Sequence, residues 1–183
     1  MFKEMILEER QESSQEIFKG KLLHVFRDDI RLPNGEKSTR EYIKHIGAVC
    51  VVPVNDDNKI IVERQYRYAV NEAIIEIPAG KLDYKGEDPL EACKRELKEE
   101  TGYVAQNYTY MGKFYPTPSY SDEVIHMYLA TGLTQGERDL DEDEFINIEV
   151  MPLKDLVKLI VEGKVPDAKT QAAVLKTWAI FNS

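Results

Sequence analysis

Three glutamates near the middle of the chain have a spacing that could bind divalent cations. The segment 88–102 predicts a helix, and at about 100° of rotation per residue it places Glu96, Glu99 and Glu100 on one face. Like charges three or four residues apart repel one another, so the grouping costs stability unless something positive binds it. Oxygen ligands suit Mg²⁺ or Mn²⁺ better than zinc. The alternative is a solvated helix face that is simply rich in glutamate.

The ends of this helix are marked in the sequence. Asp88 is a residue type that caps helix N-termini, and Pro89 suits the first helical position, where its missing N–H has no partner. Gly102 can adopt the left-handed conformation that ends many helices. Leu97 lies to one side of the glutamates and is expected to face the core. We therefore expect a helix over about residues 89–101.

Other segments predict the elements that must hold this helix in place. Short apolar runs separated by Pro, Gly, Asn or Asp are typical of strands, and two amphipathic segments end the sequence. The order of elements favours an α+β fold in which a mixed β-sheet lies between helices, an α/β/α sandwich. The expected strands are 47–54, 59–66, 73–77, 108–115, 123–130 and 145–151, and the later helices are 153–162 and 168–181.

The N-terminal region predicts an arm that precedes the main domain. Residues 1–14 are polar and are expected to be frayed. Residues 17–32 and 38–45 are extended runs on either side of Pro33-Asn34-Gly35, a turn signal, so we expect a β-hairpin. The expected division of the chain is 1–45 for the arm and 46–183 for the main domain.

The composition excludes several classes of function. The 183 residues are 43% hydrophobic, enough for one substantial core. Lys and Arg number 24 against 33 Asp and Glu, a net charge of −9, which argues against binding to nucleic acid or an anionic membrane. The chain has no apolar run long enough to span a bilayer and no apolar signal at its start. Cys50 and Cys93 fit neither a disulfide framework nor a zinc site, so we expect a cytoplasmic protein.

The segment 80–103 resembles the Nudix box. That pattern is Gly, five residues, Glu, seven residues, then Arg-Glu-U-x-Glu-Glu-x-Gly-U, where U is apolar. From Glu87 onward the match is complete, with Arg95 and the three glutamates in register. Gly80 is one residue further from Glu87 than the pattern requires, so the loop before the helix departs from it.

The resemblance implies a metal-dependent hydrolase of the Nudix family. It implies that Glu96, Glu99 and Glu100 hold Mg²⁺, with Mn²⁺ as an alternative, and that the carbonyl of Ala79 is a further ligand. Arg95 is expected to orient the glutamates, and Arg95 and Glu99 therefore belong to the catalytic group. The extra residue after Gly80 bears on the geometry at Ala79 but leaves the metal-binding half of the motif intact.

The acidic stretch 139–145 is similar to a loop that carries the general base in this family. Matching it through the apolar strand that follows places Glu142 at the base and Glu144 at a metal-associated position. A slip of one residue would place Asp141 or Asp143 there instead. A solvated acidic loop is the alternative.

Stretches outside the box resemble the ADP-ribose pyrophosphatase branch of the family. They are Leu32-Pro33-Asn34-Gly35, Arg40-Glu41, Gln65-Tyr66-Arg67 and Pro116-Thr117-Pro118-Ser119, with Pro118 where the branch has a marker proline. Arg40 and Arg67 are candidates for binding the phosphates and the terminal ribose, because a guanidinium fork matches phosphate oxygens.

The resemblance implies hydrolysis of ADP-ribose to AMP and ribose 5-phosphate. It also implies a homodimer in which the arm is exchanged between subunits. Two alternatives stay open: a pyrophosphatase for another nucleoside diphosphate sugar, and a Nudix-fold module that binds a nucleotide without cleaving it. Three crowded carboxylates weigh against the second alternative, because a binding module does not need them.

Overall fold

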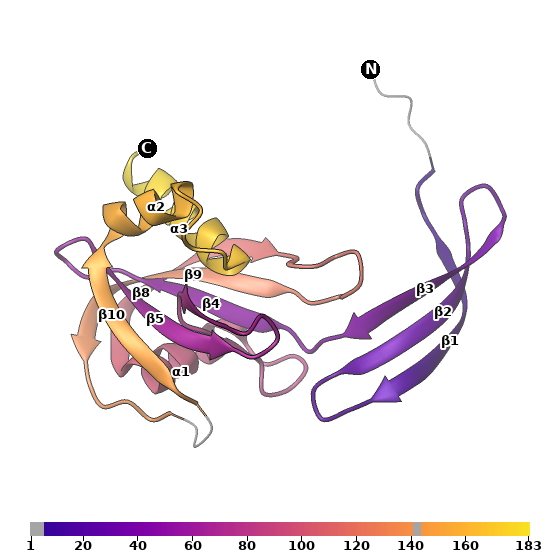
Figure 1. The fold of residues 1–183 in the computed structure, drawn as a ribbon, viewed down its shortest axis with the longest axis horizontal. Coiled ribbons are helices and arrows are strands. Elements are labelled where there is room, and N and C mark those ends of the chain that lie inside the picture. The colour runs from indigo at the N-terminus through magenta and orange to yellow at the C-terminus, as the bar shows by residue number, and fades with distance from the viewer. Residues whose placement is uncertain (1–5, 141–143) are drawn as a thin grey trace. The chain divides into compact units, whose positions relative to one another are not determined.

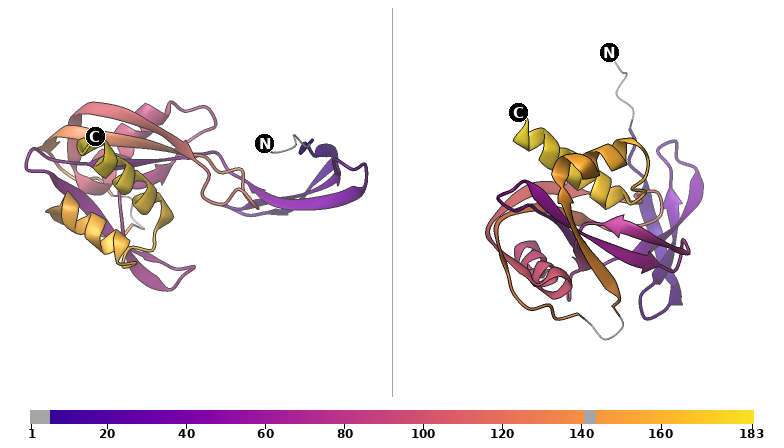
Figure 2. Two further views of the ribbon diagram at one scale, coloured as in Figure 1. Left: turned by 90° about the horizontal axis from the view of Figure 1, so that it is seen from above. Right: turned by 60° about the vertical axis from the view of Figure 1, so that its left-hand side comes forward.

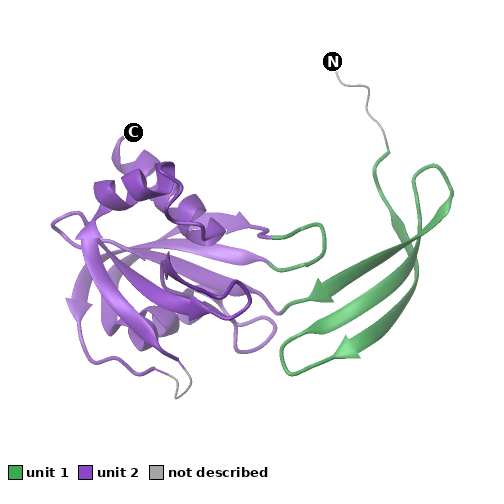
Figure 3. Ribbon diagram, in the orientation of Figure 1, with its two compact units in different colours: residues 1–45, 117–123 green, residues 46–116, 124–183 purple. Residues whose placement is uncertain are grey.

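The structure is a computed structural model that describes residues 6–140 and 144–183. The chain forms two compact units, shown in Figure 3. The first takes in the described residues up to His45 together with Thr117–Glu123, and the second takes in Ile46–Pro116 and Val124–Ser183. No helix within the described ranges is long and apolar enough to cross a membrane.

The first unit is built on an antiparallel sheet of three strands in the order β1-β2-β3 (Figure 1). The turn predicted at Pro33-Asn34-Gly35 is confirmed: Gly35 has φ +88°, and the Asn34 side chain accepts a hydrogen bond from the N–H of Glu36 at 3.0 Å. The segment 117–123 joins this unit through hydrogen bonds such as Ile43 N to Tyr120 O at 2.9 Å. The strands are β1 (Arg10–Lys19), β2 (His24–Arg31) and β3 (Lys37–Lys44).

The prediction of a frayed N-terminus is wrong from Arg10 onward. Strand β1 pairs with β2, and side chains cross between them, with Gln11 Nε2 donating to Asp28 Oδ2 at 2.7 Å and Ser13 Oγ donating to Asp29 Oδ2 at 2.8 Å. All ten residues of β1 are exposed, so the strand lacks the alternation of apolar and polar residues that would reveal it in the sequence. The expected two-stranded hairpin is therefore a three-stranded sheet.

The described residues of the second unit form two sheets and three helices. One sheet has the order β7-β4-β9-β8 and the other the order β10-β5-β6. β4 and β9 are parallel and the remaining pairs are antiparallel, so the predicted mixed character is confirmed. The strands are β4 (Ala48–Pro53), β5 (Lys59–Arg67), β6 (Glu72–Glu76), β7 (Ala79–Lys81), β8 (Tyr103–Phe114), β9 (Ile125–Gln135) and β10 (Ile146–Pro152), and the helices are α1 (Pro89–Thr101), α2 (Leu153–Val161) and α3 (Ala168–Phe181).

Strand β4 is covered on both faces, which confirms the α/β/α sandwich. Val49 and Val51 belong to a cluster that contains the buried side of α1, whereas Cys50 and Val52 belong to a cluster with α2 and α3. Successive strand residues point to opposite faces, so one buried strand serves two hydrophobic layers. Figures 1 and 2 show α2 and α3 together, with strands between them and α1.

Several boundaries differ from the prediction. β8 starts at Tyr103, directly after α1, and β9 runs on to Gln135, so both are longer than expected. The outer parts of both strands carry exposed polar residues, which hides them from a search for apolar runs. A short strand, β7, begins at Ala79, where only a turn was expected, because the backbone there pairs with β4.

Candidate active site

Helix α1 carries the glutamates and begins and ends where the sequence predicts. The Asp88 side chain accepts a hydrogen bond from the N–H of Leu90 at 2.8 Å, and Gly102 follows the last turn with φ +76°. Leu97 is fully buried in the cluster shared with β4, as expected. This packing fixes the rotation of the helix and therefore the direction of its glutamate face.

The glutamates of α1 differ in exposure. Glu96 retains 9% and Glu100 3% of its surface, whereas the Glu99 side chain is 38% exposed. The alternative of a solvated glutamate-rich face is therefore wrong for Glu96 and Glu100. Burying a carboxylate is costly unless it is paired, hydrogen-bonded or bound to a metal.

Arg95 ties these glutamates to the loop before the helix. Its Nη1 donates to Glu96 Oε1 at 2.8 Å and to Glu99 Oε2 at 3.1 Å. Its Nη2 lies 3.3 Å from Asp83 Oδ1 and 3.7 Å from Glu87 Oε2. Glu87 also accepts a hydrogen bond from the N–H of Asp83 at 2.7 Å. One guanidinium is thus shared among four carboxylates, so it orients them without neutralising them.

Strand β7 lies directly against the glutamate face. The N–H of Ala79 donates to Glu100 Oε2 at 2.9 Å. At Gly80, an added Cβ would lie 2.0–2.2 Å from the carboxylate atoms of Glu96, so only glycine leaves room for this contact. Because β7 keeps regular register with β4, the extra residue before Glu87 is accommodated in the turn that follows the strand.

Burial and the crowding of negative charge shift the pKa values of Glu96 and Glu100. Burial raises the pKa of Glu96 to about 7, against the lowering effect of Arg95, and the charges of Glu99 and Glu144 add to the rise. Burial also raises the pKa of Glu100, followed by the charges of Glu63 and Glu96. Both carboxyl groups therefore keep a proton at higher pH than an exposed glutamate does, and a cation at this face would compete with that proton.

The acidic loop approaches the C-terminal end of α1. Arg138 Nε donates to Glu100 O at 2.8 Å, and the N–H of Asp139 donates to Glu99 O at 3.2 Å. Glu144 is half-buried, and its charge acts on both Glu96 and Glu100. The charge of Glu144 thus reaches the glutamate face. The predicted base and its alternatives, Asp141, Glu142 and Asp143, lie outside the described residues.

Arg67 makes a protein contact that the sequence did not reveal. Its Nε and Nη2 donate to the two carboxylate oxygens of Glu76 at 2.5 and 2.7 Å, and Lys169 also pairs with Glu76. Burial alone would raise the pKa of Glu76, but the hydrogen bonds and charges of Arg67 and Lys169 outweigh it and lower the pKa. The Arg67 side chain remains 42% exposed, so a ligand can still reach it.

Glu63 and Glu76 are buried acidic residues that the sequence analysis missed. Each is 1% exposed, and they face one another across β5 and β6. A signal was present, because Glu63 ends the apolar run Ile60-Ile61-Val62 and Glu76 lies between Ile75 and Ile77. A single charge within an apolar run indicates a buried charged group.

Arg40 and Pro118 both lie in the first unit. Arg40 Nε donates to Glu9 Oε2 at 2.9 Å, and its Nη1 donates to the carbonyl of Thr39 at 2.9 Å. Pro118 lies in a turn closed by a hydrogen bond from Tyr120 N to Thr117 O at 3.1 Å. Their roles toward a substrate stay predictions.

The donors of the second unit fit a hard divalent cation. Carboxylate oxygens with no histidine or cysteine among them favour Mg²⁺ or Mn²⁺. Glu96 and Glu100 are buried, and Glu63 has two oxygens without a hydrogen bond among the described residues. Across residues 6–140 and 144–183, no three His, Cys, Asp or Glu side chains are gathered closely enough to hold a metal as they stand. Small side-chain movements would therefore accompany cation binding.

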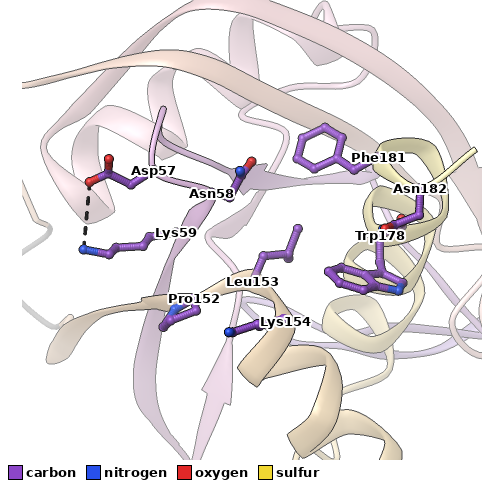
Figure 4. Close-up of a pocket in the computed structure, with 9 residues that line it drawn as sticks. All are labelled: Asp57, Asn58, Lys59, Pro152, Leu153, Lys154, Trp178, Phe181 and Asn182. Carbon is purple, nitrogen blue, oxygen red and sulfur yellow. Dashed lines mark hydrogen bonds and ion pairs between the residues drawn. The ribbon is translucent and has the colours of Figure 1, made fainter.

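A hollow of about 640 Å³ lies elsewhere in the second unit, between the start of α2, the end of α3 and the β4–β5 turn (Figure 4). It contains none of the carboxylates described above. Trp178 and Phe181 supply its aromatic surface, and the Asp57–Lys59 ion pair lies at its rim (Figure 4). The chemistry predicted from the sequence therefore lies away from this hollow.

The comparisons with known proteins agree with this geometry. Residues 44–174 match the NUDIX domain, and residues 9–43 match the nucleoside diphosphate sugar hydrolase N-terminal domain. The chain therefore belongs to the Nudix hydrolase family.

Two relatives and one solved structure resemble most of the chain. The ADP-ribose pyrophosphatase of Bacillus subtilis (strain 168) is 45% identical over 170 residues, covering 92% of this chain and 91% of the relative. The methanol dehydrogenase activator of Bacillus methanolicus is 42% identical, covering 92% of each. A crystal structure of an ADP compounds hydrolase superposes with a TM-score of 0.85 at 24% identity, covering 99% of this chain and 97% of that one, and shows the same fold.

Proposed function

We propose that this chain hydrolyses the pyrophosphate of ADP-ribose to AMP and ribose 5-phosphate with the help of Mg²⁺. The observation that carries the proposal is the burial of Glu96 and Glu100 on one helix face, with the Glu96 carboxylate in the space that Gly80 leaves and the Glu100 carboxylate bonded to the Ala79 N–H. The 45% identity to a relative named ADP-ribose pyrophosphatase supports the choice of substrate.

Glu96, Glu99 and Glu100 would hold the cation, with Glu144 and the Ala79 carbonyl as further ligands and Mn²⁺ as an alternative ion. When bound, the cation would neutralise negative charge on the diphosphate and lower the pKa of a water molecule bound to it. The chain cannot supply that neutralisation by itself, because its net charge is −9.

The chain's own residues perform the remaining steps. Arg95 holds Glu96 and Glu99 in place through its Nη1. Glu142 would act as the general base and accept a proton from the attacking water. Arg67, held by Glu76 and partly exposed, would donate its free edge to phosphate or to the terminal ribose. Arg40 and Pro118 would complete the substrate contacts.

A panel of substrates tests the proposal. ADP-ribose, GDP-mannose and other nucleoside diphosphate sugars are each incubated with the purified chain and Mg²⁺, and the products are separated by chromatography. We expect AMP and ribose 5-phosphate, with kcat/KM highest for ADP-ribose. Preference for another sugar would replace ADP-ribose as the substrate, and tight ADP-ribose binding without turnover in Mg²⁺ or Mn²⁺ would favour a binding module.

We further propose a cytoplasmic homodimer in which the N-terminal arm is exchanged. Ile30 is the one apolar residue of the first unit that is buried among its described residues, while Ile17, Phe18, Leu22 and Leu23 are 44–55% exposed. A sheet with so little core of its own needs a partner surface. Light scattering should give the mass of a dimer at micromolar concentration; a fully active monomer would exclude it.

A further inference from the structure

Glu63 is buried without any of the contacts that a buried carboxylate needs. It is 1% exposed, and neither of its carboxylate oxygens accepts a hydrogen bond from a described residue. An unpartnered buried polar group in a folded protein calls for an explanation, because the great majority have a partner. An ionised carboxylate is the most costly group to leave in this state.

Its neighbour Glu76 is a buried glutamate whose negative charge is balanced by cationic side chains. The two residues are directly opposite in the β5–β6 ladder and are equally buried. Arg67 and Lys169 both pair with Glu76. Like charges opposite one another in a sheet repel, so a second cation would be expected at Glu63. Within the described residues, no salt bridge to Glu63 takes that place.

The charge of Glu63 acts on the metal-binding carboxylates proposed above. Among the charges around Glu100, that of Glu63 raises the pKa of Glu100 the most. Burial raises the pKa of Glu63 itself, and the charges of Glu76 and Glu144 add to the rise, whereas the charges of Lys169 and Arg67 oppose it. The charge of Glu63 on β5 therefore reaches α1 and Glu144, and the side-chain movements that accompany cation binding would bring the three elements into one cation site.

We infer that Glu63 is a further cation-binding carboxylate of the site that contains Glu96, Glu100 and Glu144. The inference rests on the proposed metal-dependent function and adds a ligand from β5, outside the Nudix box and the acidic loop. A divalent cation with oxygen ligands fits the position, because it offsets the crowded negative charge and satisfies oxygens that the protein leaves without donors. Glu63 contacts the cation directly or through a water bound to it.

The competing explanation is a neutral Glu63 that keeps its proton and only fills space. Glutamine has nearly the same shape as the protonated acid, so Glu63→Gln separates the two explanations. If Glu63 binds the cation, the substitution removes a negative ligand. If Glu63 is permanently neutral, the substitution changes little.

The test measures Mn²⁺ and Mg²⁺ binding to the full chain without substrate, by calorimetry and by the electron paramagnetic resonance signal of free Mn²⁺. We expect Glu63→Gln to weaken binding about tenfold to a hundredfold or to remove one bound ion. The matched control is Glu149→Gln, a β10 glutamate whose side chain is 43% exposed and paired with Arg64, and it should bind as the wild type does. Unchanged affinity and stoichiometry in Glu63→Gln would overturn the inference.

Two further variants distinguish failure of the inference from failure of the proposed function and from a failure to fold. Glu100→Gln tests the proposed function. If Glu100→Gln and Glu63→Gln both bind the cation like the wild type, the metal-dependent function fails. If only Glu100→Gln loses cation binding, the role of Glu63 alone is refuted. Should Glu63→Gln not fold, Glu63→Met places an apolar side chain of similar volume in the same buried position. Glu63→Met should fold and bind the cation weakly; wild-type affinity would refute the inference.

Discussion

Glu96 and Glu100 lie one helical turn apart on α1, and each has a single kind of protein contact. Arg95 reaches Glu96 at 2.8 Å, and the Ala79 N–H reaches Glu100 at 2.9 Å. These contacts orient the carboxylates but leave an excess of negative charge, because Arg95 is shared with three other acidic side chains. At the scale of residues, the glutamate face therefore carries an excess of negative charge, which the proposed cation would offset.

Removing either buried charge should stop the reaction and spare the fold. In Glu96→Gln and Glu100→Gln we expect kcat for ADP-ribose to fall by about a hundredfold or more, while the metal-free protein is equally or slightly more stable because repulsion is relieved. Steady-state kinetics and thermal unfolding in EDTA measure the two effects. Glu91→Gln, on an exposed part of the same helix beside Lys94, is the control. Near-normal turnover in either buried variant would contradict the assigned roles.

The close approach of Gly80 to Glu96 leads to a prediction that depends only on steric room. In Gly80→Ala, the new Cβ would lie 2.0–2.2 Å from the Glu96 carboxylate, so Glu96 or β7 must shift. We expect weaker Mg²⁺ binding and a lower kcat, measured by calorimetry and kinetics. Gly20→Ala is the control, because its Cβ meets the ring of Phe18, an exposed side chain that can move away. Full activity in Gly80→Ala would show that the contact with Glu96 is not needed.

At the scale of elements, Glu76 joins three of them. Its carboxylate on β6 pairs with Arg67 on β5 and with Lys169 on α3. On the next residue, the N–H of Ile77 donates to Thr170 Oγ1 at 2.9 Å, so α3 is bonded to this edge twice. The contacts hold Arg67 in place beside Glu76 and attach the C-terminal helix to the sheet.

The stabilisation of the fold by the Glu76 ion pairs should depend on pH. The pKa of Glu76 is lowered below its usual 4.5, so its contribution to stability is present above about pH 4.5 and is lost as the pH falls through the lowered pKa. We expect Glu76→Gln to cost about 2–4 kcal/mol at pH 7, since one partner, Arg67, is partly exposed. The difference from the wild type should shrink toward pH 3.

Denaturant unfolding at several pH values measures this dependence. Glu72→Gln, an exposed glutamate on the same strand, serves as the control and should differ little from the wild type at any pH. A constant difference between Glu76→Gln and the wild type from pH 3 to pH 7 would show that the ion pairs are not the cause.

At the scale of the whole molecule, the carboxylate site and the single tryptophan belong to the same compact unit. Trp178 lies on α3 in the second unit, which also holds α1, β5 and Glu144. Its fluorescence therefore reports unfolding of the unit that carries the carboxylates proposed to bind metal. The first unit contains no tryptophan and should not contribute to that signal.

Mg²⁺ should raise the unfolding midpoint seen by Trp178. A ligand that binds only the folded state stabilises it, by about 2.7 kcal/mol at a hundred times its Kd. NaCl at matched ionic strength should give a smaller shift, and Glu100→Gln should lose most of the Mg²⁺ effect. Equal shifts with NaCl and with MgCl₂ would show that screening of the net charge, and not a bound ion, is responsible.

The sequence by itself determined the features that depend on near neighbours. The ends of α1, the glutamate face and the turn at Pro33-Asn34-Gly35 follow from caps, turn residues and a period of 3.6 residues, all set within a few positions. The Nudix motif identifies the family from the sequence for the same reason, because its residues lie within one continuous segment. The exposed strand β1 has no such local signal and was missed.

Only the tertiary structure decided which charged groups are buried and what they contact. Glu76 and Lys169 are 93 positions apart, and Ala79 and Glu100 are 21 apart. The structure shows that Glu63, buried like Glu76, has no hydrogen-bond donor among the described residues. Burial and pairing of this kind arise when distant segments exclude water together, so a charge within an apolar run can point to burial but does not identify the distant partner.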